Sequence, residues 1–129
     1  MSENFVVEII GPDKTILKSE VTEVTIPSYE GQMGILKDHI SLVTFLRPGL
    51  IVTKKNEEEK IFFVEEGTIE FSNNTLLILS STVKSLKDLD RHSIDNIIKN
   101  SEEKISKDET SDKEKYLLSY KINTLREIN

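Results

Sequence analysis

The first two thirds of the chain consist of short runs in which apolar and polar residues alternate. Such runs lie near residues 5–10, 23–26, 50–52, 61–63 and 69–71. A period of two is typical of strands that place one face on a core and the other in solvent. Turn residues separate the runs, which indicates an antiparallel sandwich or barrel. We favour an antiparallel β-sandwich of about ten short strands.

Several turn signals support that prediction. Residues 11–14 (GPDK) have proline at the second position of a turn, and residues 47–50 (RPGL) fit a type II turn with Gly49 third. Asn73 and Asn74 lie between two apolar runs, where asparagine can adopt the left-handed backbone of a tight hairpin. Gly31 and Gly34 are also expected in a turn, at positions that need a positive φ.

After residue 85 the glycines and prolines stop and the apolar spacing changes. The new pattern predicts a helix that begins near Asp88 or Asp90. One face of this helix carries four isoleucines, Ile94, Ile97, Ile98 and Ile105. The polar residues 107–110 interrupt the pattern, so we expect the first helix to end there.

A second helix is predicted to begin at Ser111. Ser111 precedes Glu114 by three residues, the spacing of a capping box in which each side chain satisfies a backbone donor of the other residue. Leu118, Ile122 and Leu125 then form a second apolar stripe. The short connection predicts an antiparallel helical hairpin. We therefore divide the chain into a sandwich domain, residues 1–86, and a two-helix domain, residues 87–129.

Composition and charge argue against several classes of function. The chain has no cysteine, and its two histidines lie 53 positions apart (92 minus 39), so no disulfide, thiolate site or local histidine pair exists. Residues 1–85 hold 8 basic and 13 acidic side chains, and residues 86–129 hold 9 and 10. The resulting net charge of −6 argues against nucleic-acid binding and against simple electrostatic attachment to anionic lipid.

Neither a targeting signal nor a membrane segment is apparent. The first residues, MSEN, are acidic rather than basic and lead directly into a strand-like run. No apolar run approaches the roughly 20 residues that span a bilayer. We expect a soluble cytoplasmic protein that reaches the membrane only through a partner.

His39 is the main candidate for chemistry. With Asp38 or Glu30 nearby it could act as a general base, but the chain contains no nucleophile motif, so we favour a structural or interface histidine. Gly31 and Gly34 belong to no phosphate-binding pattern. The sequence therefore predicts no catalytic residue, cofactor or metal.

Two other classes of function stay open at this point. A stand-alone module for a sugar or peptide would need an aromatic platform or a convergent polar pocket. The chain has no tryptophan and only three tyrosines, two of them in the helical part. An enzymatic role comes third, because it rests only on His39 and scattered carboxylates.

A family resemblance extends this interpretation. Residues 27–39 (PSYEGQMGILKDH) resemble the signature of ATP synthase epsilon subunits, in which a proline precedes EGx[LM]GIL and a histidine follows. Residues 42–50 (LVTFLRPGL), 63–71 (FVEEGTIEF) and 88–90 (DLD) continue the resemblance in order, over nearly the whole chain. The chain departs from the family at residues 40–41 (IS for the usual AP) and 65–66 (EE where SG is frequent).

The resemblance implies a non-catalytic part of a rotary central stalk, on the cytoplasmic side of the bacterial inner membrane and peripheral to it. The sandwich would hold the gamma subunit, with His39 near that interface. It would also rest on the loops of the rotor-ring c subunits. The implied ring contact comprises Glu30, Gly31, Gln32, Met33 and Gly34. The two helices would extend transiently toward the alpha/beta catalytic head and inhibit ATP hydrolysis.

The resemblance also raises the question of nucleotide binding. Some bacterial epsilon subunits bind ATP between these helices through an [IL]DxxRA motif. In one frame the arginine position falls on Ser93, whereas another frame supplies Arg91 beside Asp90. The second helix offers Lys121 and Arg126 as phosphate partners. We expect at most a weak nucleotide site at Asp90, Arg91 and Arg126.

Overall fold

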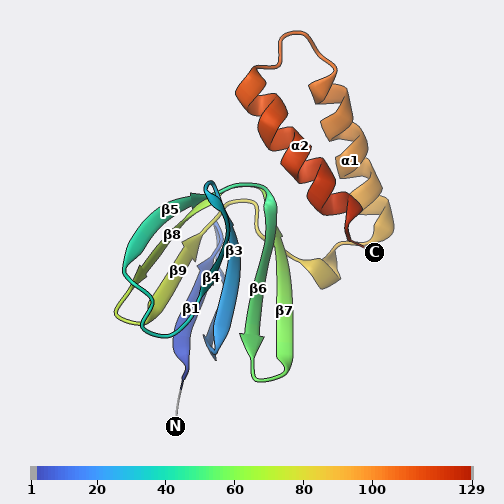
Figure 1. Cartoon of the computed structure of the whole chain (residues 1–129). Coiled ribbons are helices and arrows are strands. Elements are labelled where there is room, and N and C mark those ends of the chain that lie inside the picture. Colours follow the sequence, from blue (N-terminus) through green and yellow to red (C-terminus); the bar gives the residue numbers. More distant parts are fainter. Residues whose placement is uncertain (1–2, 129) are drawn as a thin grey trace.

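A computed structural model describes residues 3–128. Its two parts are a curved β-sheet folded around one core and a pair of helices at one end of the sheet (Figure 1). The strands are β1 (Phe5–Ile10), β2 (Thr15–Val21), β3 (Glu23–Ser28), β4 (Gly31–Ile35), β5 (Leu42–Leu46), β6 (Gly49–Lys55), β7 (Glu58–Val64), β8 (Gly67–Ser72), β9 (Thr75–Leu79) and β10 (Lys84–Ser85). A short 3₁₀ turn, η1 (Leu86–Asp88), leads to the helices α1 (Arg91–Ile105) and α2 (Asp112–Arg126).

The strands of the described chain form one continuous sheet that curls over itself. Their order is β10-β7-β6-β3-β5-β8-β9-β1-β2, and β4 pairs with β3 outside this path. The expected antiparallel pairing holds with one exception, because β1 and β9 are parallel, with Val7 beside Leu76 and Ile9 beside Ile78. A parallel pair requires a long connection, and the seven strands β2 to β8, which lie between β1 and β9 in the chain, supply it.

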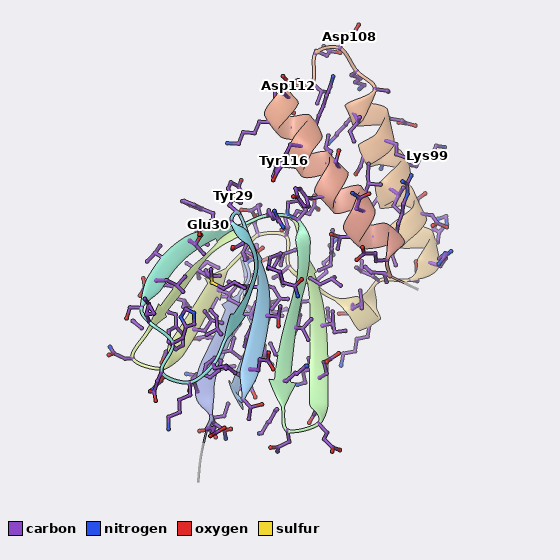
Figure 2. All side chains as sticks on the ribbon, viewed as in Figure 1. Tyr29, Glu30, Lys99, Asp108, Asp112 and Tyr116 are labelled. Carbon is purple, nitrogen blue, oxygen red and sulfur yellow. The ribbon has the colours of Figure 1, made fainter. Side chains whose placement is uncertain are left out.

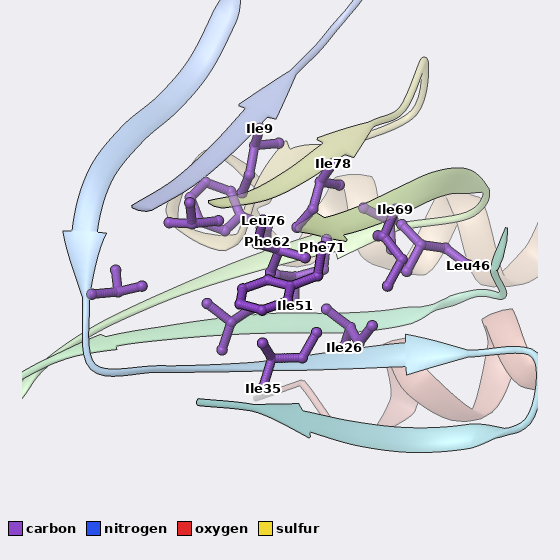
Figure 3. Packing of buried hydrophobic residues seen from close by; sticks show 14 of the residues in the cluster. Ile9, Ile26, Ile35, Leu46, Ile51, Phe62, Ile69, Phe71, Leu76 and Ile78 are labelled. Carbon is purple, nitrogen blue, oxygen red and sulfur yellow. The ribbon is translucent and has the colours of Figure 1, made fainter. Parts of the chain in front are cut away.

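The core of the sheet follows from the alternation in the sequence. Inward-facing residues of β1, β3, β8 and β9 meet those of β4 and β6 in a single apolar cluster (Figure 3). The cluster includes an aromatic contact, in which the rings of Phe5 and Phe71 meet edge to face with their centroids 5.7 Å apart. The largest fully buried side chains include Ile9, Ile26, Ile35, Leu46, Ile51, Ile69, Phe71, Leu76 and Ile78.

The turns confirm one backbone prediction and correct another. Asn73 and Asn74 join β8 to β9 with φ values of 50° and 55°, the left-handed geometry expected of them. Gly49 does not have the positive φ of a type II turn, so that prediction was wrong. It begins β6 instead, and a Cβ there would lie 2.5 Å from Cβ of Pro27. Close approach of β3, rather than turn geometry, requires glycine at this position.

The two helices begin where the sequence predicts. Asp90 caps α1, because its carboxylate accepts a hydrogen bond from the backbone N–H of Ser93 at 2.7 Å. Ser111 caps α2 by accepting from the backbone N–H of Glu114 at 3.1 Å. Only this half of the expected capping box forms, since the Glu114 carboxylate accepts from the Ser111 hydroxyl and not from its backbone N–H. The apolar stripes of both helices are turned inward, and Ile94, Ile122 and Leu125 are buried.

A second, smaller apolar cluster joins the hairpin to the sheet. Phe63 lies on the face of β7 opposite the main core and packs with Ile94 and Leu125. Half-buried residues surround these three, namely Leu50, Leu89, Ile97, Ile98 and Ile128. Neither helix is long and apolar enough to cross a membrane, a finding that covers residues 3–128.

Candidate functional site

The turn between β3 and β4 projects from the end of the sheet that also carries the helices (Figure 2). Ser28 pairs with Gly31, which leaves Tyr29 and Glu30 as a two-residue turn, and both side chains are exposed. The Ser28 hydroxyl donates to the carbonyl of Gly31 at 2.6 Å, and the Tyr29 N–H donates to the carbonyl of Phe45 at 3.1 Å. These bonds hold the turn firmly and direct Glu30 into solvent.

The five residues predicted as one contact segment divide between turn and strand. Gly31 has φ +127°, which explains its glycine, and Gln32 is exposed at the start of β4. Met33 packs partly against the main core. Gly34 lies within β4 opposite Thr25 without a positive φ, so the expectation of a turn glycine was wrong there. The outward-facing part of the segment is therefore centred on Glu30 and Gln32.

The loop that carries His39, residues 36–41, is tied to the turn between β8 and β9. The backbone N–H of Asp38 donates to Oδ1 of Asn74 at 2.7 Å, and Nδ2 of Asn74 donates to the Asp38 carboxylate at 2.9 Å. Asp38 has a φ of 65°, and Asn74 has a φ of 55°. Two left-handed residues from different turns thus hold each other in place.

His39 makes the contacts of a structural ring. Its ring meets Phe71 edge to face, with centroids 5.9 Å apart, and its Nδ1 lies 2.8 Å from the carbonyl oxygen of Ile40. The Asp38 carboxylate is engaged by Asn74 rather than by the imidazole. The Asp–His pair considered from the sequence is therefore not formed, and His39 orients the loop beside β5.

An apolar surface that the sequence analysis missed lies next to this loop. Val43 and Phe45 point outward from β5 with 72% and 60% of their surface exposed, and Ile40 is 72% exposed. Pairing of β5 with β8 and of β8 with β9 places Phe45, Thr68 and Leu79 in one outward row. We define the apolar outer face by Leu36, Ile40, Val43, Phe45 and Leu79. Residues 42–46 (LVTFL) are apolar in both strand registers, a composition that also fits a strand buried on both faces.

Polar contacts supplement the small cluster between the sheet and the hairpin. Lys121 of α2 lies 2.6 Å from the Glu65 carboxylate, and this pair is the least exposed ion pair of the described chain. The Arg47 guanidinium lies 4.0 Å from the centroid of the Tyr120 ring. Glu65 is the first of the two residues at positions 65–66, where the chain departs from the family pattern, so this departure provides a partner for α2.

The second departing residue, Glu66, is used within the sheet. Its carboxylate accepts hydrogen bonds from the hydroxyl and the backbone N–H of Ser81. Its carbonyl accepts from the hydroxyl of Ser80 at 2.7 Å, and its N–H donates to Thr82 at 3.2 Å. The strand start at Gly67 is thereby fixed by side chains of the segment after β9.

The candidate nucleotide residues each have a different local partner. Asp90 caps α1, and the hydrogen bond from the Ser93 N–H lowers the pKa of its carboxyl. Arg91 lies 3.8 Å from Asp95 on the same helix. Arg126 of α2 bridges to Glu102 of α1 at 2.6 Å. The two arginines that could hold a polyphosphate are thus both paired with carboxylates in this structure.

Together these features define a class of protein: a small β-sheet domain with exposed contact surfaces and an attached helical hairpin. Among residues 3–128 no group of histidine, aspartate and glutamate side chains is arranged to hold a metal.

Comparison with known proteins identifies the family. Residues 4–85 match the family described as ATP synthase, Delta/Epsilon chain, beta-sandwich domain. A Pelagibacter ubique protein named ATP synthase epsilon chain is 43% identical over 130 residues, covering 100% of both chains. A Dichelobacter nodosus protein of the same name is 35% identical over 95 residues, covering 73% of this chain and 66% of that one. The chain therefore belongs to the ATP synthase epsilon chain family.

Solved structures show the same fold at lower identity. A chain in the structure of Euglena gracilis mitochondrial ATP synthase, with OSCP, F1 and the c-ring, superposes with a TM-score of 0.83. It is 19% identical, and the match covers 98% of this chain and 82% of that one. The combination of curved sheet and helical hairpin is thus shared with a chain of a rotary ATP synthase.

Proposed function

We propose that this chain is a non-catalytic central-stalk subunit of a proton-translocating ATP synthase. It couples rotation of the rotor ring to ATP synthesis and inhibits ATP hydrolysis through its C-terminal helices. It lies on the cytoplasmic side of the bacterial inner membrane and is attached to the membrane only through its partner subunits. The apolar outer face is the observation that supports this proposal. An exposed apolar patch on a small protein is typical of a surface that a partner protein covers.

The apolar outer face is the proposed contact for the gamma subunit. Phe45 and Val43 supply large apolar side chains on a rigid strand, which suits the centre of a stable interface. His39 supports the adjacent loop through Phe71 and lies beside this face. Its role in the proposal is therefore to position Ile40 and its neighbours for gamma.

The β3–β4 turn is the proposed contact for the c subunits of the rotor ring. Glu30 and Gln32 are exposed there, and the hydrogen bonds of Ser28 and Tyr29 keep the turn rigid. A rigid acidic turn is complementary to polar loops that carry basic residues. Glu30→Lys with Gln32→Lys should weaken binding to isolated rings. The control variant Glu57→Lys with Glu58→Gln makes the same change in charge at the β6–β7 hairpin and should leave ring binding unchanged. If the two double variants bind isolated rings equally well, the proposed contact is contradicted.

The helical hairpin is the proposed inhibitory element. In residues 3–128 only Phe63, Ile94 and Leu125 are buried in its contact with the sheet, and the chain between the helices is polar. Unfurled, about 40 residues at ~1.5 Å each would reach ~60 Å, far enough to extend from the stalk toward the alpha/beta head. Changing a mostly docked population to a mostly extended one needs roughly 5.5 kcal/mol of differential binding. Apolar stripes freed from the hairpin supply surface for that binding.

Copurification with gamma tests the main proposal. Phe45→Glu buries a charge in the proposed interface and should weaken gamma binding by at least about thirtyfold, the range of an interface hot spot. Tyr116→Glu, on an exposed position of α2, is the matched control and should bind normally. Gamma binding that is unaffected by Phe45→Glu, in a folded variant, contradicts the proposed face.

Deletion of residues 87–129 tests whether the sheet alone couples rotation to ATP synthesis and the hairpin inhibits hydrolysis. Because the contact surfaces proposed for gamma and the ring all lie in the sheet, residues 1–86 should suffice for proton-driven ATP synthesis in reconstituted vesicles. The same deletion should raise ATP hydrolysis. A folded truncated chain that no longer couples the two processes contradicts the domain boundary and its interpretation.

A further inference from the structure

The curled sheet does not close into a barrel, and a cleft lies at the opening. Strand β2 pairs only with β1, which leaves its other edge without a strand. At the opposite end of the sheet, β10 covers β7 only at Phe62 and Phe63. Residues 58–61 of β7 therefore present a second open edge, and the two edges flank the cleft.

The cleft has a volume of about 760 Å³, within the range of roughly 300–1,000 Å³ typical of small-molecule sites. Its lining comes from the start of β2, the middle of β7 and residues 83–88. A smaller hollow of about 110 Å³ continues it between β2 and β6, and Leu17 and Lys60 line both. The two hollows thus adjoin at these two residues.

Part of the lining of the cleft is apolar. Leu17, Ile16 and Val83 are partly buried and pack against the main core, and Phe62 belongs to that core. Ile61 adds a half-buried side chain. Partly buried apolar side chains thus line the cleft where no further strand covers them. Such a floor binds a hydrocarbon chain by removing its surface from water.

Lysines surround this apolar floor. Lys14, Lys60, Lys84 and Lys87 line the cleft against two acidic residues, Glu59 and Asp88, a local charge of +2 (four minus two) on a chain of −6. Within residues 3–128 none of the four lysines forms an ion pair, and Glu59 pairs with Lys54, which does not line the cleft. The cleft therefore combines an apolar floor with unneutralised positive charge.

We propose that this cleft binds a single-chain anionic amphiphile, of which a long-chain carboxylate is the simplest member. The hydrocarbon chain lies along Leu17 and Phe62 between the two open strand edges. The carboxylate lies at the mouth, where Lys60 and Lys84 supply its counter-charge. None of these residues belongs to the surfaces proposed for gamma or the rotor ring, so the site is independent of those contacts.

Titration of the ¹⁵N-labelled full chain with oleate below its micelle concentration tests the site. We expect saturable binding at one site, with amide shifts concentrated in residues 14–17, 59–62 and 83–88. Shifts centred instead on Val43 and Phe45 would mean that oleate covers the apolar outer face, and this overturns the proposal. Dodecyltrimethylammonium, an amphiphile of opposite charge, should bind at least about tenfold more weakly. Equal binding of the two also overturns it.

Charge reversal tests the role of the lysines. Lys60→Glu with Lys84→Glu should weaken oleate binding at least about tenfold, because like charges then face the carboxylate. Lys99→Glu with Lys113→Glu makes the same change in charge on exposed positions of the hairpin and should leave binding unchanged (Figure 2 shows Lys99). Equal effects of the two double variants would show a response to net charge alone and overturn the proposal.

Discussion

The sheet and the hairpin are held by very different amounts of apolar packing. In the described chain the main core contains fifteen buried side chains drawn from nine strands, whereas three buried side chains join the hairpin to the sheet. The sheet is therefore a rigid platform, and the hairpin is an attachment with a small apolar contact. One short chain thus combines a tightly packed sheet with a helical hairpin that is held by a much smaller apolar contact.

The polar contacts follow the same division. Within the sheet, hydrogen bonds such as those between Asp38 and Asn74 connect turns that are far apart in sequence. Between sheet and hairpin, the Lys121–Glu65 ion pair and the stacking of Arg47 on Tyr120 are partly solvent-exposed. Partly exposed charge contacts contribute modestly and weaken with salt. The hairpin should thus respond to conditions that leave the sheet unchanged.

The largest effect should come from the main core. Phe71→Ala removes a buried ring that contacts Phe5 and His39, and should lower the free energy of unfolding by about 3–5 kcal/mol. Denaturant titration measures it. Phe45→Ala removes an equal volume from an exposed site of the same sheet and should change stability by less than about 0.5 kcal/mol. Similar losses in the two variants would contradict the assignment of these faces.

A smaller and more local effect is expected at the hairpin contact. Leu125→Ala creates a cavity beside Phe63 and should destabilise docking by about 2–3 kcal/mol. Amide exchange should accelerate in α1 and α2 while the protected amides of β1, β8 and β9 keep their rates. Equal acceleration of exchange in both parts would show that sheet and hairpin unfold together, and would contradict the weaker attachment of the hairpin.

Covalent retention of the hairpin should change the activity of the complex. The chain lacks cysteine, so Glu65→Cys with Lys121→Cys places two unique thiols where the ion pair stands. Bridging them with a flexible bis-maleimide should raise ATP hydrolysis several-fold, because the helices can no longer extend. The same variant treated with a monofunctional maleimide is the control. Equal hydrolysis with and without the bridge argues against an inhibitory extended form.

The smallest effect should be the pH dependence of the first helix. The Ser93 N–H lowers the pKa of Asp90, so the capping carboxylate stabilises α1 above the ordinary aspartate pKa of about 3.9. That contribution is lost as the pH falls through the lowered pKa of the folded state. Asp90→Asn keeps a capping oxygen that does not titrate. The helix stability of this variant, measured by circular dichroism, should therefore fall less at acid pH than that of the unchanged chain. An equal fall in the two chains contradicts the assignment.

Local patterns in the sequence predicted much of this fold, and contacts between distant segments account for what they missed. Alternation predicted the strands, and cap residues such as Asp90 and Ser111 predicted the helix starts. Gly49 was misassigned to a turn because its need for glycine arises from Pro27, a residue of another strand. The pairing of Glu65 with Lys121 likewise has no local signal.

The candidate site was harder to predict than the fold. The family resemblance pointed to Glu30 and His39, and the structure places the first in an exposed turn and the second in a supporting loop. It did not point to Val43 or Phe45, because an outward-facing apolar strand has the same composition as a buried one. Exposure depends on which neighbours cover a strand, and residues 42–46 alone contain no such information.

The parallel pairing of β1 with β9 has a consequence for how the chain is made. Val7 of β1 pairs with Leu76 of β9, so these two strands cannot pair until nearly eighty residues have left the ribosome. Contacts so distant in sequence slow folding, since a long loop must close before they form. During synthesis the hairpin of β1 and β2 must wait with one apolar face uncovered, and we expect this interval to be the step most dependent on chaperones.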